Sequence, residues 1–191
     1  MPDFEVANSS AASHRLGITA PEMFPTPPNV VHVDHQREAD RIISARARRS
    51  TLVPITDSQT VSMADAYAIQ RCVTAARLAQ GERIVGWKLG YTSKVMRSQM
   101  AIDEPNFGPL TNQMVLDNGG LVPGTVVQPK VEPEVALRFA KPLIGECSID
   151  EVLDAAESAY ACLEIVDAVW ADYRFRIEDN TADGSDRKSV V

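Results

Sequence analysis

Two glutamates stand two residues apart in the apolar stretch Val131-Glu132-Pro133-Glu134-Val135. Alternate residues of a β-strand share a face, so Glu132 and Glu134 are predicted to lie side by side, opposite a row of apolar residues. Their Cα atoms would be about 6.6 Å apart, which is two strand rises. Carboxylates this close raise each other's pKa unless a cation lies between them. The pattern therefore indicates either a solvated sheet face or a cation site.

A third carboxylate, Glu164, lies in the run Ala161–Val166, which is too apolar for an exposed strand. An ionised glutamate in such a place needs a partner. One alternative is a structural salt bridge, to Arg138 or Lys130. The other is that Glu164 joins the glutamate pair on one divalent ion. Three carboxylates suit the hard cations Mg²⁺ and Mn²⁺, and they leave about three positions of an octahedral ion for a chelating substrate and a water.

Lys88 is a further candidate, because it interrupts the apolar, glycine-flanked stretch Gly86–Gly90. One interpretation is an edge lysine that extends its ammonium to water. The other is an ammonium beside the metal, which binds a carboxylate or moves a proton. The spacing of the residues leaves both open.

The composition limits the classes of protein to consider. The chain has 191 residues, 45% hydrophobic and 24% charged, which is enough to bury the core of one domain. The formal net charge of −7 argues against a nucleic-acid partner, and no apolar run approaches the roughly 18 residues of a membrane span. The three widely separated cysteines predict reduced, mostly buried thiols in a cytoplasmic protein.

Helices are predicted early in the chain, after a proline-rich segment over residues 1–32 that we interpret as a disordered arm or an overlong start. Helical spacing of apolar residues predicts helices over Asp34–Arg48 and Ser62–Gln80. A third is predicted over Ser148–Tyr160. Ser62 with Asp65, and Ser148 with its own acid three residues later, have the spacing of capping boxes.

Strands are predicted to dominate the rest of the chain, which makes the fold class α+β. Their expected positions are Ile84–Leu89, Val126–Phe139, Cys162–Val169 and the alternating residues Tyr173, Phe175 and Ile177. The turn sequence Asp117–Gly120 also predicts a hairpin between Gln113–Leu116 and Leu121–Val122.

Four motifs, in order along the chain, resemble the fumarylacetoacetate hydrolase superfamily. The resemblance is to its branch of 2-keto-4-pentenoate hydratases and 4-oxalocrotonate decarboxylases. It runs from about Ile55 to Ser185, and the helical segment Asp65–Gln70 also fits. The motifs are Gly86-Trp87-Lys88-Leu89-Gly90-Tyr91-Thr92-Ser93, Asp103-Glu104-Pro105-Asn106-Phe107-Gly108-Pro109-Leu110, Gln128-Pro129-Lys130-Val131-Glu132-Pro133-Glu134-Val135-Ala136 and Leu163-Glu164-Ile165-Val166-Asp167.

The resemblance implies roles for five residues. Glu132, Glu134 and Glu164 would hold Mg²⁺ or Mn²⁺, Lys88 would lie in the active site, and Asp103 would lie near the bound substrate. The implied fold is a mixed β-roll with N-terminal helices packed on it. The implied partner is a small 2-oxo or 2-hydroxydienoic acid from the meta-cleavage degradation of aromatic compounds, and the full-length protein is expected to be a homo-oligomer.

The implied activity is a metal-dependent hydratase that adds water to a 2-hydroxy-2,4-dienoate and gives a 4-hydroxy-2-oxo acid. The alternative within the branch is decarboxylation of 2-oxohex-3-enedioate, since both reactions need the same enolate to be stabilised. A carbon–carbon bond hydrolase would need a water-activating base, typically a histidine, and the matching region contains none. A non-catalytic fragment or assembly partner is a further alternative.

The resemblance has two local departures and one at the end of the chain. Relatives often carry Asp-Ser-Arg where this chain has Asp167-Ala168-Val169, and Thr181–Ser185 changes the middle of the family's Ala-Asp-Asn-Ala-Ser element. The missing arginine puts a local salt bridge in doubt. Because relatives continue further, we interpret residues 33–185 as a C-terminally truncated domain whose roll is incomplete.

The last six residues, 186–191, match one reading frame of a sequencing adapter, so we hypothesise a non-native tail, the alternative being a genuine short terminus. Sequencing the 3′ end of the intact gene distinguishes the two. A truncated sheet exposes unpaired edges, so we expect the chain alone to be poorly soluble or inactive.

Overall fold

The structure is a computed structural model that describes residues 32–122, 124–185 and 187–190. Residues Val33–Val191 form one compact unit. The predicted arm lies outside the described residues, apart from His32. Among the helices of the described ranges, none has the length and apolar character that a membrane span requires.

The two long helices of the N-terminal half each begin at a side-chain N-cap, of which the one at Ser62 was predicted. Helix α1 (His35–Arg48) is capped by Asp34, whose carboxylate accepts the amide of Arg37 at 3.0 Å. Helix α2 (Met63–Ala79) begins with the predicted capping box of Ser62 and Asp65. The short helix η1 (Ile55–Asp57) lies between them. The predicted boundaries of both long helices are therefore confirmed to within about a turn.

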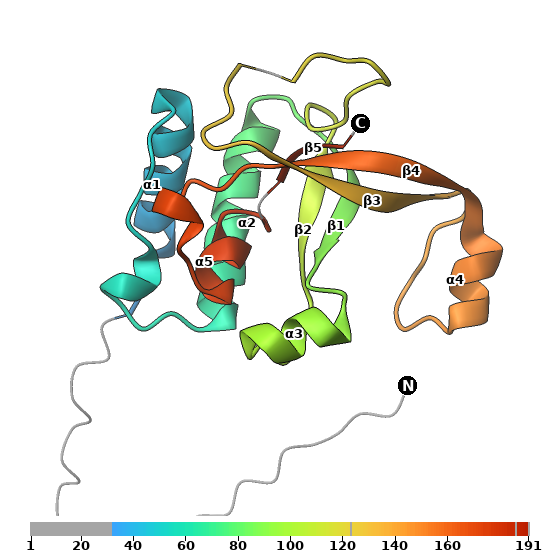
Figure 1. Cartoon of the computed structure of the whole chain (residues 1–191), viewed down its shortest axis with the longest axis horizontal. Helices are drawn as coiled ribbons and strands as arrows, with labels where there is room; N and C mark the ends of the chain where they lie inside the picture. The colour runs from blue at the N-terminus through green and yellow to red at the C-terminus, as the bar shows by residue number, and fades with distance from the viewer. Residues whose placement is uncertain (1–31, 123, 186, 191) are drawn as a thin grey trace, which may run out of the picture. The chain divides into compact units, whose positions relative to one another are not determined.

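The hydrophobic core lies among α1, α2, the segment 168–170 and helix α5 (Ile177–Ala182) (Figure 1). The short helix η2 (Ala171–Tyr173) joins the last two. One apolar face of each long helix points inward, as their spacing predicts. The fully buried residues of the core are Ala39, Ile42, Ala66, Ile69, Ala168, Val169, Trp170 and Ala182.

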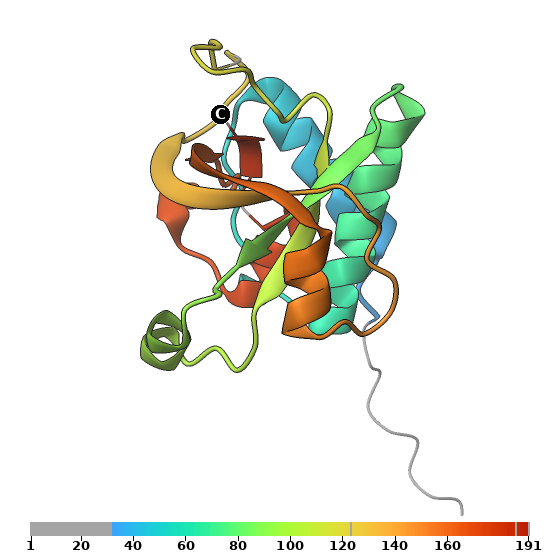
Figure 2. The ribbon, with the colours of Figure 1, turned by 90° about the vertical axis from the view of Figure 1, so that its right-hand side faces the viewer.

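Two small antiparallel sheets follow. Strand β1 (Ile84–Gly90) pairs with β2 (Asn106–Thr111), and helix α3 (Lys94–Met100) connects them. Strand β3 (Lys130–Phe139) pairs with β4 (Ala156–Val166), which pairs in turn with β5 (Arg187–Val190). The helix α4 (Ile149–Ala155) closes the far end of the long β3–β4 ribbon (Figure 2). Together with the helical layer, the sheets confirm the α+β class.

Three predicted elements are wrong in part. The helix expected over Ser148–Tyr160 ends at Ala155, because the next residues pair with β3 as the start of β4. The turn at Asp117–Gly120 forms, with the Gly120 amide donating to the Asp117 carbonyl at 2.7 Å, but its described flanks are not paired strands. Tyr173, Phe175 and Ile177 form no strand either, because η2 ends at Tyr173 and α5 begins at Ile177. Strand β2 was not predicted at all.

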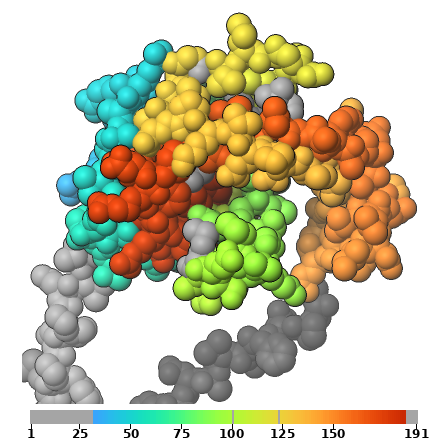
Figure 3. Space-filling view, viewed as in Figure 1, coloured from blue at the N-terminus to red at the C-terminus, as the bar shows by residue number. Residues whose placement is uncertain are grey.

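One face of the β3–β4 ribbon is apolar and largely exposed. Its large side chains are between 42% and 72% exposed, whereas the glutamates lie on the opposite face. The outer part of the ribbon and α4 stand apart from the α3 segment, with an open notch between them (Figure 3). The exposed members of the apolar face are Val131, Val135, Leu137, Phe139 and Leu163.

Candidate metal centre

The pairing of β3 with β4 brings the three predicted glutamates together. Glu132 lies directly opposite Glu164 in the register, and Glu134 is two residues further along the same face. Each glutamate offers one carboxylate oxygen, and these oxygens lie within 4.8 Å of one another. Glu164 is 2% exposed and the Glu134 side chain is 39% exposed. The cluster therefore has a buried end at Glu164 and an open end at Glu132.

Lys88 reaches this cluster from the other sheet. Its Nζ lies 2.8 Å from Glu134 Oε1 and also pairs with Glu164. The side chain is only 14% exposed, so the interpretation as an edge lysine in water is wrong. Glu164 does form a salt bridge, but its partner is Lys88, whereas Arg138 pairs with Glu157 at 2.9 Å and Lys130 lies over the ring of Tyr173.

The pKa values of the buried pair follow from their surroundings. Burial raises the pKa of Glu164, although the hydrogen bond and charge of Lys88 oppose this effect. Burial by itself lowers the pKa of Lys88, but the hydrogen bonds and charges of Glu134 and Glu164 outweigh it, so the net pKa lies above its usual value. The two glutamates therefore favour the ammonium form of Lys88, which contacts them as a cation and hydrogen-bond donor.

The donor set fits a hard divalent cation. Oε1 of Glu164 is buried and has no hydrogen-bond partner among the described residues. An unsatisfied buried carboxylate oxygen is costly unless a further positive group contacts it. Three carboxylates against the single ammonium of Lys88 also leave an excess of negative charge. Oxygen-only donors of this kind are the ligands that Mg²⁺ and similar ions prefer.

Asp103, the remaining predicted site residue, is not brought into this cluster. It is exposed in the loop between α3 and β2, and it makes no hydrogen bond or ion pair with another described residue. Asn106, three residues later, is fully buried instead, and its Nδ2 donates to Asn180 at 2.8 Å and to Thr181 at 2.9 Å. A role of Asp103 near the substrate stays a prediction.

An ion-pair network that was not predicted from the sequence lies at the inner end of the glutamate strands. Arg46 of α1 pairs with Asp167 at 3.0 Å and with Asp183 at 2.7 Å, and both carboxylates are fully buried. Asp167 thus has an arginine partner, although this arginine comes from a distant helix and not from position 169. The charged residue Asp167 at the end of an apolar run was the one available signal.

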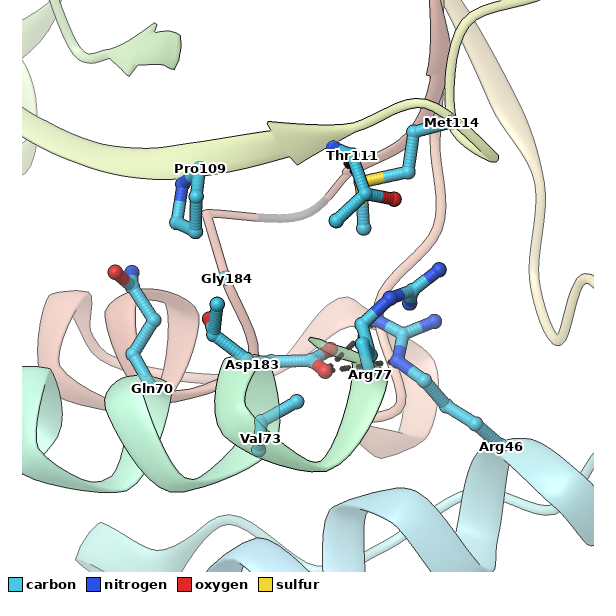
Figure 4. A pocket seen from close by; sticks show the side chains of 10 residues that line it. Arg46, Gln70, Val73, Arg77, Pro109, Thr111, Met114, Asp183 and Gly184 are labelled. Atoms are coloured by element: carbon cyan, nitrogen blue, oxygen red, sulfur yellow. Dashed lines mark hydrogen bonds and ion pairs between the residues drawn. The ribbon is translucent and has the colours of Figure 1, made fainter. Parts of the chain in front are cut away.

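Two concavities of the described chain lie away from the glutamates. A cavity of about 20 Å³, room for about one water, is lined by Arg46, Gln70, Thr111 and Asp183 among others (Figure 4). A groove of about 550 Å³ on α2 and the first sheet is largely apolar and includes the ring of Phe107. Neither contains a member of the carboxylate cluster. The three free thiols, of Cys72, Cys147 and Cys162, are half-buried rather than mostly buried as predicted.

Comparison with known proteins gives the chain its family. No family model matches it. However, a 2-hydroxypent-2,4-dienoate hydratase of Pseudomonas putida is 35% identical over 150 residues, which cover 76% of this chain and 68% of that relative. The chain belongs to the family of 2-keto-4-pentenoate hydratases and 4-oxalocrotonate decarboxylases. This confirms the resemblance seen in its four motifs.

Other members of this hydratase and decarboxylase family agree. A 4-oxalocrotonate decarboxylase of Pseudomonas sp. is 32% identical over 156 residues, 81% of this chain and 61% of that relative. The solved 4-oxalocrotonate decarboxylase of Pseudomonas putida G7, complexed with magnesium and adipate, superposes with a TM-score of 0.76 at 26% identity. That match covers 82% of this chain and 60% of the solved one. The chain spans between 55% and 68% of the length of the curated relatives that it matches here.

Proposed function

We propose that Glu132, Glu134 and Glu164 bind one divalent cation, Mg²⁺ or Mn²⁺, at the active site of a hydratase. The observation that carries this proposal is the set of three carboxylate oxygens within 4.8 Å of one another, with the buried Oε1 of Glu164 lacking a partner among the described residues. The magnesium complex of the Pseudomonas putida G7 decarboxylase supports it. The substrate class is a 2-hydroxy-2,4-dienoate, to which water is added to give a 4-hydroxy-2-oxo acid.

The side chains around the ion would have different roles, which follow from their burial and charge. When bound, the ion supplies Lewis-acid stabilisation of the oxyanion that develops on a chelating 2-oxo acid. Glu164, held by Lys88, forms the dry floor of the site, and Glu132 faces the solvent from which substrate comes. The Lys88 ammonium, 2.8 Å from Glu134, is placed to bind a substrate carboxylate or to donate a proton.

Decarboxylation of 2-oxohex-3-enedioate is the second candidate, supported by the decarboxylase relatives. Both reactions depend on the same stabilised enolate, so the carboxylate cluster serves either. A decarboxylase needs an additional group for the second substrate carboxylate, and we identify none among the described residues. Two hydratase relatives, moreover, are 35% and 36% identical to this chain, whereas the decarboxylase relative is 32% identical.

The larger setting of the site is part of the same proposal. We infer that the two sheets belong to the mixed β-roll of the superfamily and that residues 33–185 form the hydratase-like domain. Asp103 near the substrate, a homo-oligomeric full-length protein and a cytoplasmic location remain predictions. So does the non-native tail over residues 186–191, whose residues 187–190 form β5 beside β4.

Titration calorimetry with Mn²⁺ tests the metal centre in this chain. We expect one site per chain, lost in Glu132→Gln and in Glu164→Gln. Glu157→Gln is the matched control, because this exposed β4 glutamate pairs with Arg138 and lies outside the cluster. No binding by the unaltered chain, or equal binding by Glu132→Gln, would contradict the proposal and would favour a non-catalytic partner.

Product analysis with the full-length protein tests the reaction. With Mn²⁺ present, 2-hydroxypenta-2,4-dienoate should lose its dienol absorbance and yield the 4-hydroxy-2-oxo acid. Release of carbon dioxide from 2-oxohex-3-enedioate, without hydration of the dienoate, would assign the decarboxylase instead.

A further inference from the structure

One carboxylate ties together the two strands that carry the glutamates. Asp167 follows the last residue of β4 and lies three residues beyond Glu164. Its Oδ1 accepts the backbone amides of Val127 and Gln128, each at 2.7 Å, just before β3 begins. Asp167 therefore closes the inner end of the β3–β4 pair, which is the end nearer to the carboxylate cluster.

Arg46 holds this carboxylate from the helical layer. Its Nη1 donates to Asp167 Oδ2 at 3.0 Å, and its Nη2 donates to the Asp167 carbonyl at 2.9 Å. The same guanidinium binds Asp183, as Figure 4 shows, and the second oxygen of Asp183 accepts the Val169 amide at 3.0 Å. The Arg46 side chain is 11% exposed, and both aspartates are fully buried. A planar guanidinium is suited to hold two carboxylates in one fixed geometry.

We propose that Arg46 is a positioning residue for the metal centre and acts through Asp167. This inference rests on the proposed metal site. The outer part of the ribbon is largely exposed, with Val135 at 72%, so packing there does little to fix β3 against β4. The strand ladder places Glu132 opposite Glu164, and the inner anchor holds the end of this ladder, two residue pairs away from them. Loss of the anchor would let this end of the ladder open, so Glu132 and Glu164 are the carboxylates whose spacing it would change first.

The test compares two arginines of the same helix. Arg46→Gln removes the anchor, whereas Arg41→Gln removes the ion pair of a half-buried arginine with the buried Glu38, away from Asp167. Mn²⁺ affinity is measured by calorimetry well below the unfolding temperature of each variant, and hydrogen exchange is followed at the Val127 and Gln128 amides. We expect Arg46→Gln to weaken Mn²⁺ at least tenfold and to accelerate both amides at least tenfold. Arg41→Gln should leave both quantities within twofold of the unaltered chain.

A conservative variant separates positioning from general stability. Arg46→Lys keeps the positive charge but offers a single ammonium in place of the fork, so it should recover part of the affinity while the two amides stay fast. If Arg46→Gln does not fold, Arg46→Lys decides by the same measurements. Unaltered affinity and unaltered exchange in the Arg46 variants would overturn the inference. If the unaltered chain does not bind Mn²⁺, the metal proposal is overturned, and with it the positioning of a metal by Arg46. The exchange rates of the Val127 and Gln128 amides would still show whether Arg46 anchors the two strands.

Discussion

The helical layer and the β3–β4 ribbon differ in how they are held. The helical layer is stabilised by hydrophobic burial, because Ile42, Ile69 and Trp170 come from different elements and are fully buried in one core. In the ribbon, Val135 is 72% exposed and Ile149 of α4 is 79% exposed, so strand pairing and helix caps supply most of the stabilisation there. Stability is thus concentrated on one side of the molecule and the candidate chemistry on the other.

This division suits a site that brings like charges together. Packing three carboxylates near one another is unfavourable without a cation, and a region of low local stability adjusts to the ion more readily than a packed core does. The Arg46 network lies at the boundary between the two regions. The apolar face of the ribbon is exposed as well, and the homo-oligomer stays a prediction.

The largest contrast is expected between core and ribbon truncations. Trp170→Ala removes a fully buried ring whose Nε1 donates to the Asp179 carbonyl at 3.0 Å, so we expect a loss of about 3–5 kcal/mol in the free energy of unfolding. Val135→Ala, in the exposed face, should change it by less than about 0.5 kcal/mol. Denaturant unfolding measures both. Equal losses would mean that the ribbon face is covered in solution.

A smaller contrast is expected between two acidic side chains. Asp179 is 1% exposed and accepts the amide of Thr56 at 3.1 Å and its hydroxyl at 2.5 Å. Asp179→Ala leaves these partly buried donors unpaired, so about 2–3 kcal/mol should be lost. Asp154→Ala breaks only the exposed pair with Lys141 and should leave the unfolding curve unchanged. A comparable loss for Asp154→Ala would remove the distinction between the two regions.

The two capping boxes provide a matched comparison of helix ends. Ser62→Ala uncaps α2 in the packed layer and should cost about 1 kcal/mol of global stability. Ser148→Ala makes the same change in the exposed α4, where we expect faster amide exchange within α4 and little change in global unfolding. If Ser148→Ala lowers global stability as much as Ser62→Ala, α4 unfolds together with the core.

The smallest effect is expected from acid. The Ser62 hydroxyl and then His35, which is 2.8 Å away, lower the pKa of Asp65 from 3.8 to about 2. The unfolded chain therefore binds more protons between these pH values, so stability is lost as the pH falls from about 4 to about 2. The side chain is 31% exposed, so the change should stay below about 1 kcal/mol. Asp65→Asn should flatten this part of the stability–pH curve, and an unchanged slope would contradict the assignment.

Local signals in the sequence predicted local features well. The caps at Ser62 and Ser148 and the alternation around Pro133 depend on neighbouring residues only, and each appears where expected. The prediction of a helix through Tyr160 was wrong because α-helical spacing continues past Ala155, while strand pairing takes over the backbone there. Strand β2 was missed because its residues Asn106–Thr111 lack apolar alternation, and pairing with β1 makes it a strand.

The candidate site divides in the same way. Residue types and spacing alone identified Glu132, Glu134, Glu164 and Lys88, because carboxylates and an ammonium in apolar strands demand partners. Which partner each one has depends on the approach of segments far apart in the chain, since Lys88 comes from the other sheet and Arg46 from the first helix. Ion pairs across 76 and 121 residues leave no periodic trace in a sequence. They are consequences of packing, and packing settles how the carboxylates are held.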